Sequence, residues 1–260
     1  MDATDPYPRL GSSATALLLS SERAVRRAIR LATNEQLVLP RFVLVFCGNR
    51  VDRVSLMGCA LLDFAVVARV LRRVAVFCGS SAGTNPNLSR YSYEVGRGLA
   101  ERGIGLVYGA GGFGLMRDVS QGALDAGGEV IGVIPRSMLE REWGRNDLTE
   151  LHVVETMHER KAMMAEHADA FLCLPGGLGT LDEIMEVWSW RQIGFNDDPV
   201  GFLNVDGFWT PLLDALDGLV DAGFVRREVM DDLVVADNLD DALTGLANRT
   251  GATPRKFARE

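Results

Sequence analysis

The sequence predicts an α/β fold: a doubly wound parallel sheet with helices on both faces. Three observations lead to this prediction. From Arg73 onward, short apolar runs alternate with segments of helical spacing. The runs are apolar at every position, and glycine-rich loops follow three of them. Strands buried on both faces show this continuous pattern, and their alternation with helices is typical of parallel sheets. The 260 residues, 47% hydrophobic and 24% charged, suffice for one large domain or two small ones.

Each predicted strand is short and is followed by a turn. The strands are expected at 74–78, 105–108, 129–134, 152–155, 170–174, 199–203 and 233–235. Helices are expected at 88–102, 114–126, 209–221 and 239–248, with two more carrying Arg160 and the residues 181–188. Glycine-rich loops follow the first, second and fifth strands. These loops lie at the carboxyl ends of the strands. In doubly wound sheets ligands bind at those ends, so we expect a site there.

The two ends of the chain differ from this pattern. Residues 1–70 lack glycine turns between their weak helix candidates, 21–33 and 55–71. We expect a poorly ordered or dispensable extension there, a single α/β domain over 71–250, and a polar, basic tail at 251–260 that frays.

Composition excludes several classes of protein. The formal net charge of −8 offers no basic surface, so no nucleic-acid partner is expected. The most apolar long stretch, 54–71, carries Asp63 and Arg69, and no signal-peptide pattern opens the chain. We therefore expect a cytoplasmic protein without a membrane partner.

Metal ligands and disulfides are not expected either. The four cysteines form no CxxC pair, and each lies in an apolar run, which is typical of reduced, buried thiols. The three histidines have no zinc-ligand spacing with one another or with cysteine. No metal and no cofactor are therefore predicted.

The most informative stretch is Leu174-Pro-Gly-Gly-Leu-Gly-Thr-Leu-Asp-Glu183, which reads as the end of a buried strand, a glycine turn and a helix start. Gly176, Gly177 and Gly179 leave room for main-chain N–H groups to converge on a ligand. The positive end of the helix dipole adds to the same spot, so a phosphate would bind well there.

The acidic residues of this stretch have two interpretations. Thr180 and Glu183 match a capping box, in which each side chain bonds to the other residue's backbone, and that pattern requires no catalysis. It does not explain the three glycines before it. Glu183 also lies three residues from Glu186, close enough for the two charges to repel and raise a pKa. Glu183 is therefore a candidate catalytic carboxylate.

A second glycine loop, Gly109-Ala-Gly-Gly-Phe-Gly114, matches the G-x-G-x-x-G pattern of dinucleotide sites. It follows the second strand, however, and no acidic residue ends the next strand, because Glu129 begins it. NAD binding is therefore disfavoured. Contact with a nucleotide remains the favoured interpretation, with a plain tight turn as the alternative.

A charged cluster, His158-Glu-Arg-Lys161, directly follows the fourth strand. Such clusters often form solvated helix faces. At this place, however, the first helical turn should face the ligand edge, where Arg160 could bind a phosphate through two N–H groups and Lys161 as a point charge.

Together these motifs resemble one family. Pro175-Gly-Gly-Leu-Gly-Thr-Leu-Asp-Glu183 matches the PGGxGTxxE signature of the Lonely Guy family, the cytokinin riboside 5′-monophosphate phosphoribohydrolases, and Met157–Ala162 matches its arginine–lysine motif. The resemblance covers about 73–248. It implies a Rossmann-like fold, a homodimer, and hydrolysis of the N-glycosidic bond of a nucleoside 5′-monophosphate (a cytokinin type or AMP) to free base and ribose 5-phosphate.

The resemblance also implies roles for single residues. The catalytic pair falls on Arg160 and Glu183. The expected substrate contacts are Glu142, Lys161, Gly176, Gly177, Leu178, Gly179, Thr180, Leu181 and Asp182, with Ser80, Gly109, Gly111 and Gly112 from the other two loops. Arg117 departs from the family, which often has a small residue there.

Two alternatives remain open at this point. A non-catalytic nucleotide carrier could have the same architecture, because a fold does not fix a function. A pyridoxal-phosphate decarboxylase is disfavoured, because Lys161 and Lys256 are the chain's only lysines, and Lys256 lies in the tail.

Overall fold

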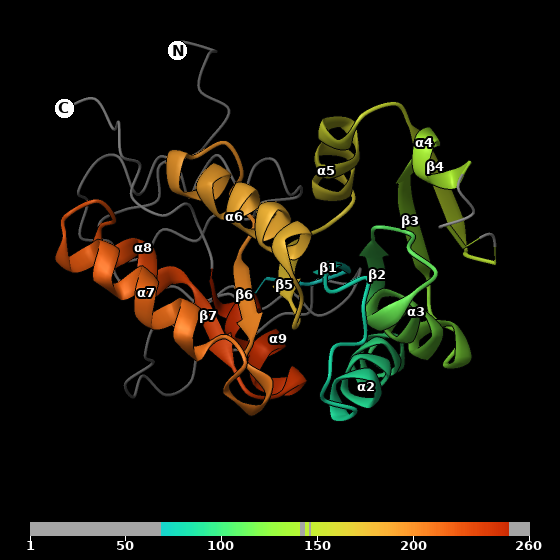
Figure 1. Cartoon of the computed structure of the whole chain (residues 1–260), viewed down its shortest axis with the longest axis horizontal. Helices are drawn as coiled ribbons and strands as arrows, with labels where there is room; N and C mark the ends of the chain where they lie inside the picture. The colour runs from blue at the N-terminus through green and yellow to red at the C-terminus, as the bar shows by residue number, and fades with distance from the viewer. Residues whose placement is uncertain (1–68, 141–143, 146, 250–260) are drawn as a thin grey trace, which may run out of the picture. The chain divides into compact units, whose positions relative to one another are not determined.

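The computed structural model describes residues 69–140, 144–145 and 147–249, so the expectations for 1–68, 250–260 and Glu142 lie outside the described residues. The described chain forms one seven-stranded, fully parallel sheet in the order β4-β3-β2-β1-β5-β6-β7 (Figure 1). The chain runs outward from β1 to one edge and then from β5 to the other. The predicted doubly wound α/β fold is therefore confirmed.

The bounds of the elements agree closely with the prediction. The strands are β1 Arg73–Phe77, β2 Gly105–Tyr108, β3 Val130–Pro135, β4 Glu150–Val154, β5 Ala170–Cys173, β6 Val200–Leu203 and β7 Val234–Ala236. The helices are α2 Asn87–Glu101, α3 Gly114–Asp125, α4 Arg136–Leu139, α5 Met157–Glu166, α6 Leu178–Ile193, α7 Thr210–Asp221, α8 Arg227–Asp232 and α9 Leu239–Asn248, with a 3-10 turn, η1, at Val205–Gly207. The turn η1 and the helices α4 and α8 were not predicted, because elements this short do not contain enough residues to show helical periodicity.

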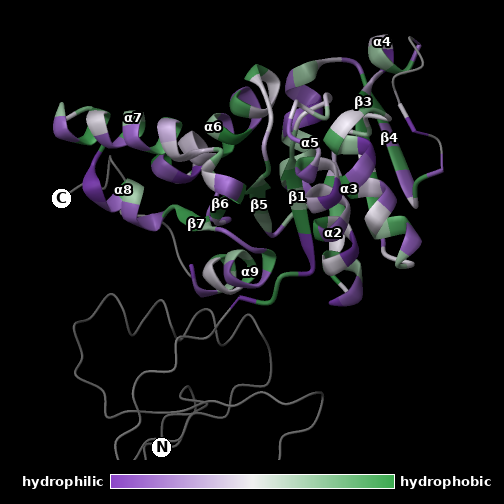
Figure 2. Ribbon diagram, turned by 60° about the horizontal axis from the view of Figure 1, so that its bottom comes forward, coloured by the Kyte–Doolittle hydropathy of each residue, from purple (hydrophilic) through white to green (hydrophobic). Residues whose placement is uncertain are grey.

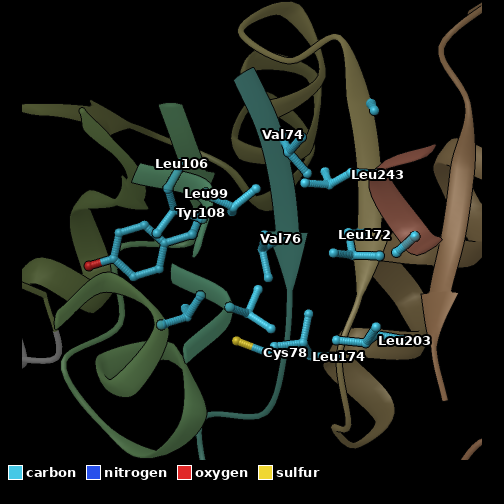
Figure 3. Packing of buried hydrophobic residues seen from close by; sticks show 14 of the residues in the cluster. Val74, Val76, Cys78, Leu99, Leu106, Tyr108, Leu172, Leu174, Leu203 and Leu243 are labelled. Carbon is cyan, nitrogen blue, oxygen red and sulfur yellow. The ribbon is translucent and has the colours of Figure 1, made fainter. Parts of the chain in front are cut away.

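The sheet separates two hydrophobic cores. One core packs strand side chains such as Val74, Val76 and Tyr108 against α2, α3 and α9. Figure 3 shows this face, with the β1 side chains between Leu106 on β2 and Leu172 on β5. The other core packs the opposite side chains of the same strands against α5, α6, α7 and α8. The central strands are mostly hydrophobic, apart from the charged Arg73 at the start of β1, whereas the helices carry both kinds of residue (Figure 2).

Two glycines let α2 and α3 pack with their backbones almost touching. A Cβ on Gly96 would lie 1.8 Å from the Val119 carbonyl oxygen, and one on Gly122 would lie 1.9 Å from that of Tyr93. Because α3 begins at the loop after β2, this close packing fixes the position of that loop relative to β1.

The described chain begins with a residue that is tied to the sheet domain. Arg69 donates its backbone N–H to the Ala247 carbonyl and forms an ion pair with Asp198. Burial raises the pKa of Asp198, and the Arg69 charge opposes that rise. The expected boundary at residue 71 would remove this partner.

We expect a chain shortened to begin at Val66 to unfold at the same temperature as the full chain. One beginning at Leu71 should lose about 1–3 kcal/mol, because it leaves a largely buried carboxylate without its cation. Thermal unfolding of both proteins checks this. Equal stability of the two shortened chains would show that the Arg69 contacts contribute nothing.

Candidate active site

The strand order reverses between β1 and β5, and the loops after these two strands meet there, where the Gly79 N–H donates to the Pro175 carbonyl. A cavity of about 700 Å³ lies at this point, at the carboxyl ends of the strands, as expected for a doubly wound sheet. Three glycine-containing segments line it: the loop after β1, the loop after β2, and the turn from β5 into α6. The lining includes Gly79, Ser80, Ser81, Gly109, Gly111, Arg160, Gly176, Gly177, Leu178, Gly179, Thr180, Asp182 and Glu183.

The helix α6 points its uncapped N-terminus at this cavity. Its N-cap is Gly177, and among the described residues no side chain caps the first turn by a hydrogen bond. The first N–H groups of a helix have no partner within the helix, so those of Leu178 and Gly179 are available to a ligand. Gly176 must lack a side chain, because a Cβ there would lie 2.1 Å from Thr180 Oγ1 and 2.9 Å from the Gly79 nitrogen.

The capping-box interpretation of Thr180 and Glu183, one of the two left open by the sequence, is wrong. Since α6 begins at Leu178, Thr180 already lies inside the helix, and Glu183 is too far along it to reach the cap. The motif forms instead at the start of α5, where Thr156 and Glu159 bond to each other's backbone N–H groups. The glycine turn allows α6 to begin earlier than the side-chain pattern indicates.

Glu183 contacts a residue from a different helix. Arg160 Nη1 lies 2.7 Å from Glu183 Oε1, and both side chains are buried, 6% and 4% exposed. Arg160 also donates from Nε to the Val133 carbonyl at 3.1 Å and from Nη2 to the Gly109 carbonyl at 3.4 Å. These contacts to the ends of β2 and β3 hold the guanidinium in one place, so the carboxylate is held as well.

The approach of Arg160 requires a glycine at 109. A Cβ at that position would lie 1.6 Å from Arg160 Nη2. Gly109 is therefore needed by the arginine whether or not it also touches a ligand.

The environment of Glu183 shifts its pKa. Burial raises its pKa above the ordinary value of 4.5, the Arg160 charge opposes that rise, and the Asp182 charge adds to it. A carboxylate with a raised pKa in a cavity is typical of general acid–base sites.

The structure brings most of the expected site residues to one cavity. Besides Arg160 and Glu183, these are Ser80, Gly109, Gly111, Gly176, Gly177, Leu178, Gly179, Thr180 and Asp182. Gly112 does not line the cavity, and Leu181 packs against the core between the sheet and α6. Lys161 does not line it either, because its ammonium group is bound to Asp182 and Glu186.

The apolar part of the cavity wall was not predicted. It is formed by Phe113, Met116, Ile134, Met138, Met157 and Phe208. Of these, Phe113 is 60% exposed, and Leu178, which also lines the cavity, is 86% exposed. The only signal in the sequence was the position of Phe113 and Met157 next to a glycine loop and a strand end. Nothing pointed to Phe208, which directly follows the distant turn η1.

The second glycine loop also has a structural role. Gly114 has φ +55°, and a Cβ on it would lie 2.5 Å from the Ser80 carbonyl carbon. The loop therefore packs directly on the loop after β1 and helps to hold Ser80 at the cavity. Arg117, the departure from the family pattern, is exposed and outside the lining.

The described residues include no candidate metal site and no candidate membrane-spanning helix. Over the ranges that the structure describes, no group of three or more His, Cys, Asp or Glu side chains could hold a metal ion. Among the helices of those same ranges, none has the length and hydropathy needed to cross a membrane. The two described cysteines, Cys78 and Cys173, are buried and free.

Comparisons with known proteins agree with these motifs. A family model described as possible lysine decarboxylase matches residues 116–246. The chain is 46% identical over 176 residues to the probable cytokinin riboside 5′-monophosphate phosphoribohydrolase LOG4 of Oryza sativa subsp. japonica, covering 68% of this chain and 76% of that protein. It is 46% identical over 165 residues to the cytokinin riboside 5′-monophosphate phosphoribohydrolase LOG3 of Arabidopsis thaliana, covering 64% and 77%.

A solved structure supports the fold independently. The Moco carrier protein from Chlamydomonas reinhardtii matches with a TM-score of 0.52 at 22% identity, covering 68% of this chain and 96% of that one. This likeness concerns the fold alone. The identity to the plant proteins and the match of the family model establish that the chain belongs to the Lonely Guy family, the cytokinin riboside 5′-monophosphate phosphoribohydrolases.

Proposed function

We propose that this protein hydrolyses the N-glycosidic bond of nucleoside 5′-monophosphates, of the cytokinin type or AMP, releasing the free base and ribose 5-phosphate. The observation that carries the proposal is the buried pair of Arg160 and Glu183, which lies in the same cavity as the uncapped N-terminus of α6. The pair supplies a carboxylate for the reaction, and the helix N-terminus supplies an anion site for the phosphate.

The phosphate would bind at the turn from β5 into α6. Main-chain N–H groups and the helix dipole favour an anion there, and the glycines admit it closely. Arg160 already bonds to Glu183 and to two carbonyl groups, so we assign it mainly to holding the carboxylate. Binding the phosphate places the sugar against Glu183, and such positioning contributes several kcal/mol to catalysis.

Glu183 would stabilise the positive charge that develops on the ribose and would also act as the base. Cleavage of the glycosidic bond builds positive charge on the ribose, which a nearby carboxylate stabilises. As the water oxygen bonds to C1′ and the C1′–N bond breaks, Glu183 takes the proton from the water. The base leaves with the bonding electron pair and takes up a proton from solvent, and Glu183 returns its proton to solvent, so that one water is consumed for each free base released. Asp182 is an unsuitable proton donor for the base, because it forms an ion pair with Lys161 at 3.0 Å.

The direct test is base release. The protein is incubated with AMP and with N6-isopentenyl-AMP, and free adenine and isopentenyladenine are separated and measured. We expect turnover of at least one nucleotide. Binding of both without release of base would favour the alternative, a nucleotide carrier, and would overturn the proposal.

The pH dependence gives a separate prediction. Glu183 accepts a proton only as a carboxylate, and its pKa is raised by burial. As the pH falls through that raised pKa, kcat should fall, so the acidic limb of the kcat profile should lie above pH 4.5. A limb at or below 4.5 would contradict the assignment of Glu183 as the base.

The contribution of Glu183 to stability has the opposite sign. Because its pKa is higher in the folded chain than in the unfolded one, that contribution is fully present below the unfolded pKa and is lost as the pH rises through the folded pKa. Activity at this group therefore comes at a cost in stability, as is usual for buried catalytic carboxylates.

A decarboxylase mechanism is less suitable for this site. Burial alone would lower the pKa of Lys161, but the bonds to Glu186 and Asp182 outweigh it, and the net pKa is raised. Such a lysine stays an ammonium ion, whereas Schiff-base chemistry needs the free amine.

Homodimer formation, which the family resemblance implies, and a cytoplasmic location, which the composition predicts, also form part of the proposal. Exposed apolar side chains beside the cavity, such as Leu178 and Phe113, are compatible with a partner subunit covering them. Sedimentation at micromolar concentration tests the dimer, and a monomer throughout would contradict it.

A further inference from the structure

Lys161 stands out because its expected contact and its observed contacts differ. The family resemblance implies that it touches the nucleotide. In the structure its side chain is 7% exposed, and its Nζ lies 3.0 Å from Asp182 Oδ2 and 3.0 Å from Glu186 Oε2. The cavity lining does not include it.

The two neighbouring cations of α5 therefore have separate partners on α6. Arg160 reaches Glu183 on the cavity side, whereas Lys161 reaches the residues one before and three after Glu183. Asp182 and Glu186 are four residues apart, so they lie on one face of the helix, where a single ammonium group can bind both. A nearly buried lysine is stable only when its charge is paired in this way.

We propose, building on the hydrolase function above, that Lys161 is a positioning residue: by binding Asp182 and Glu186 it joins α5 to α6 and neutralises the two carboxylates beside Glu183, without touching the nucleotide. Two consecutive residues of α5 then divide the work. Arg160 fixes the reacting carboxylate, and Lys161 sets the charge around it.

The charges around Glu183 support this division. Arg160 and Lys161 face it from α5, Asp182 and Glu186 flank it on α6, and the buried thiols of Cys78 and Cys173 lie below it on the strand side. Asp182 raises the pKa of Glu183, and Lys161 lowers it. Without the lysine, two uncompensated carboxylates would favour protonation of the group that must act as base.

The test compares Lys161→Met, Glu186→Gln and the double variant with the wild-type protein. Methionine keeps the length and apolar stem of the lysine but removes its charge. We expect Lys161→Met to move the acidic limb of kcat upward by on the order of one pH unit, with KM changed less than about twofold. Glu186→Gln should move the limb downward. In the double variant the limb should return toward the wild-type position, because one positive and one negative charge are lost together.

Each outcome bears on the proposal. A rise of about tenfold or more in KM for Lys161→Met, with the acidic limb unmoved, would show that Lys161 binds the nucleotide and would overturn it. A double variant with the same limb as Lys161→Met would also overturn it. If Lys161→Met does not fold, the downward shift in Glu186→Gln remains required, because that variant keeps the lysine.

A second readout separates this proposal from the proposed function. Titration of the Glu183 carboxyl carbon by 13C NMR, in wild-type protein and in the same variants, reports the pKa of Glu183 without any substrate. The shifts should have the same signs as those of the acidic limb. If wild-type protein releases no base yet the NMR shifts appear, the hydrolase function fails and the role of Lys161 stands. If base is released and the NMR shifts are absent, the hydrolase function stands and the proposed role of Lys161 is wrong.

Discussion

Glu183→Gln is expected to lower kcat for base release by roughly 10²–10⁴-fold, the usual contribution of a general base. The amide has the size of the carboxylate, and its oxygen can still accept the hydrogen bond from Arg160. It cannot take a proton from water, and it does not stabilise positive charge on the ribose. KM for the nucleotide should change little, because the proposed phosphate site is the N-terminus of α6, five residues before Glu183 in the helix.

Stability separates this loss from misfolding. Removing the charge of Glu183 relieves the cost of burying it but leaves the buried Arg160 without a counter-charge, and these effects oppose each other. We therefore expect only a small change in Tm. The matched control is Glu94→Gln on the exposed face of α2, which should keep full activity. Retention of more than about a tenth of wild-type kcat in Glu183→Gln would remove Glu183 from the mechanism.

Much of this fold follows from the sequence because the strands are buried on both faces. A run such as Ala170–Cys173 is apolar at every position, so its type and bounds can be recognised without knowledge of its neighbours. Prediction is less accurate for β4, which lies at the edge of the sheet. The exposed start of β4 was missed at Glu150 and Leu151, because an edge strand buries less and its pattern is weaker.

The site was harder to predict than the fold. That the glycine loops meet at one edge follows from the parallel topology, whereas the contact between Arg160 and Glu183 depends on the rotation of two helices about their own axes. Periodicity places a residue on a helix face but does not say which residue of another helix lies opposite. The partners of Lys161, which are 21 and 25 residues along the chain, could not be predicted for the same reason.

The capping-box pattern occurs twice in this sequence but forms a capping box only once. Both Thr156–Glu159 and Thr180–Glu183 match the capping pattern, and only the first pair forms a box. The difference arises from the residues before the helix. At α6 the glycine turn lets the helix begin at Leu178, which moves Thr180 into the helix and turns Glu183 toward the cavity. The sequence pattern that fails to form its usual capping box thus lies at the proposed active site, where conflicts between local pattern and structure are expected.

Gly109→Ala is expected to lower kcat by roughly 10²-fold although no reacting group is changed. The added Cβ would lie 1.6 Å from Arg160 Nη2 and 2.8 Å from Cζ, so the guanidinium must move. It cannot move without breaking its contacts to the Gly109 carbonyl and to Glu183. The backbone of Gly109 is not in the left-handed region, so alanine causes no strain in the main chain itself. Overpacking should also lower the free energy of unfolding by about 1–3 kcal/mol.

A double-mutant cycle shows whether Gly109 acts through Arg160. In an Arg160→Ala background the space beside residue 109 is empty, so Gly109→Ala should have almost no further effect on kcat, although it is severe in the wild-type background. Gly218→Ala in α7, where a Cβ meets nothing within 4 Å, is the matched control and should leave kcat unchanged. If the effects of Gly109→Ala and Arg160→Ala multiply, Gly109 acts independently of the arginine, for instance by touching the nucleotide itself. Non-additivity would show instead that the glycine exists at this position to admit the side chain that holds Glu183.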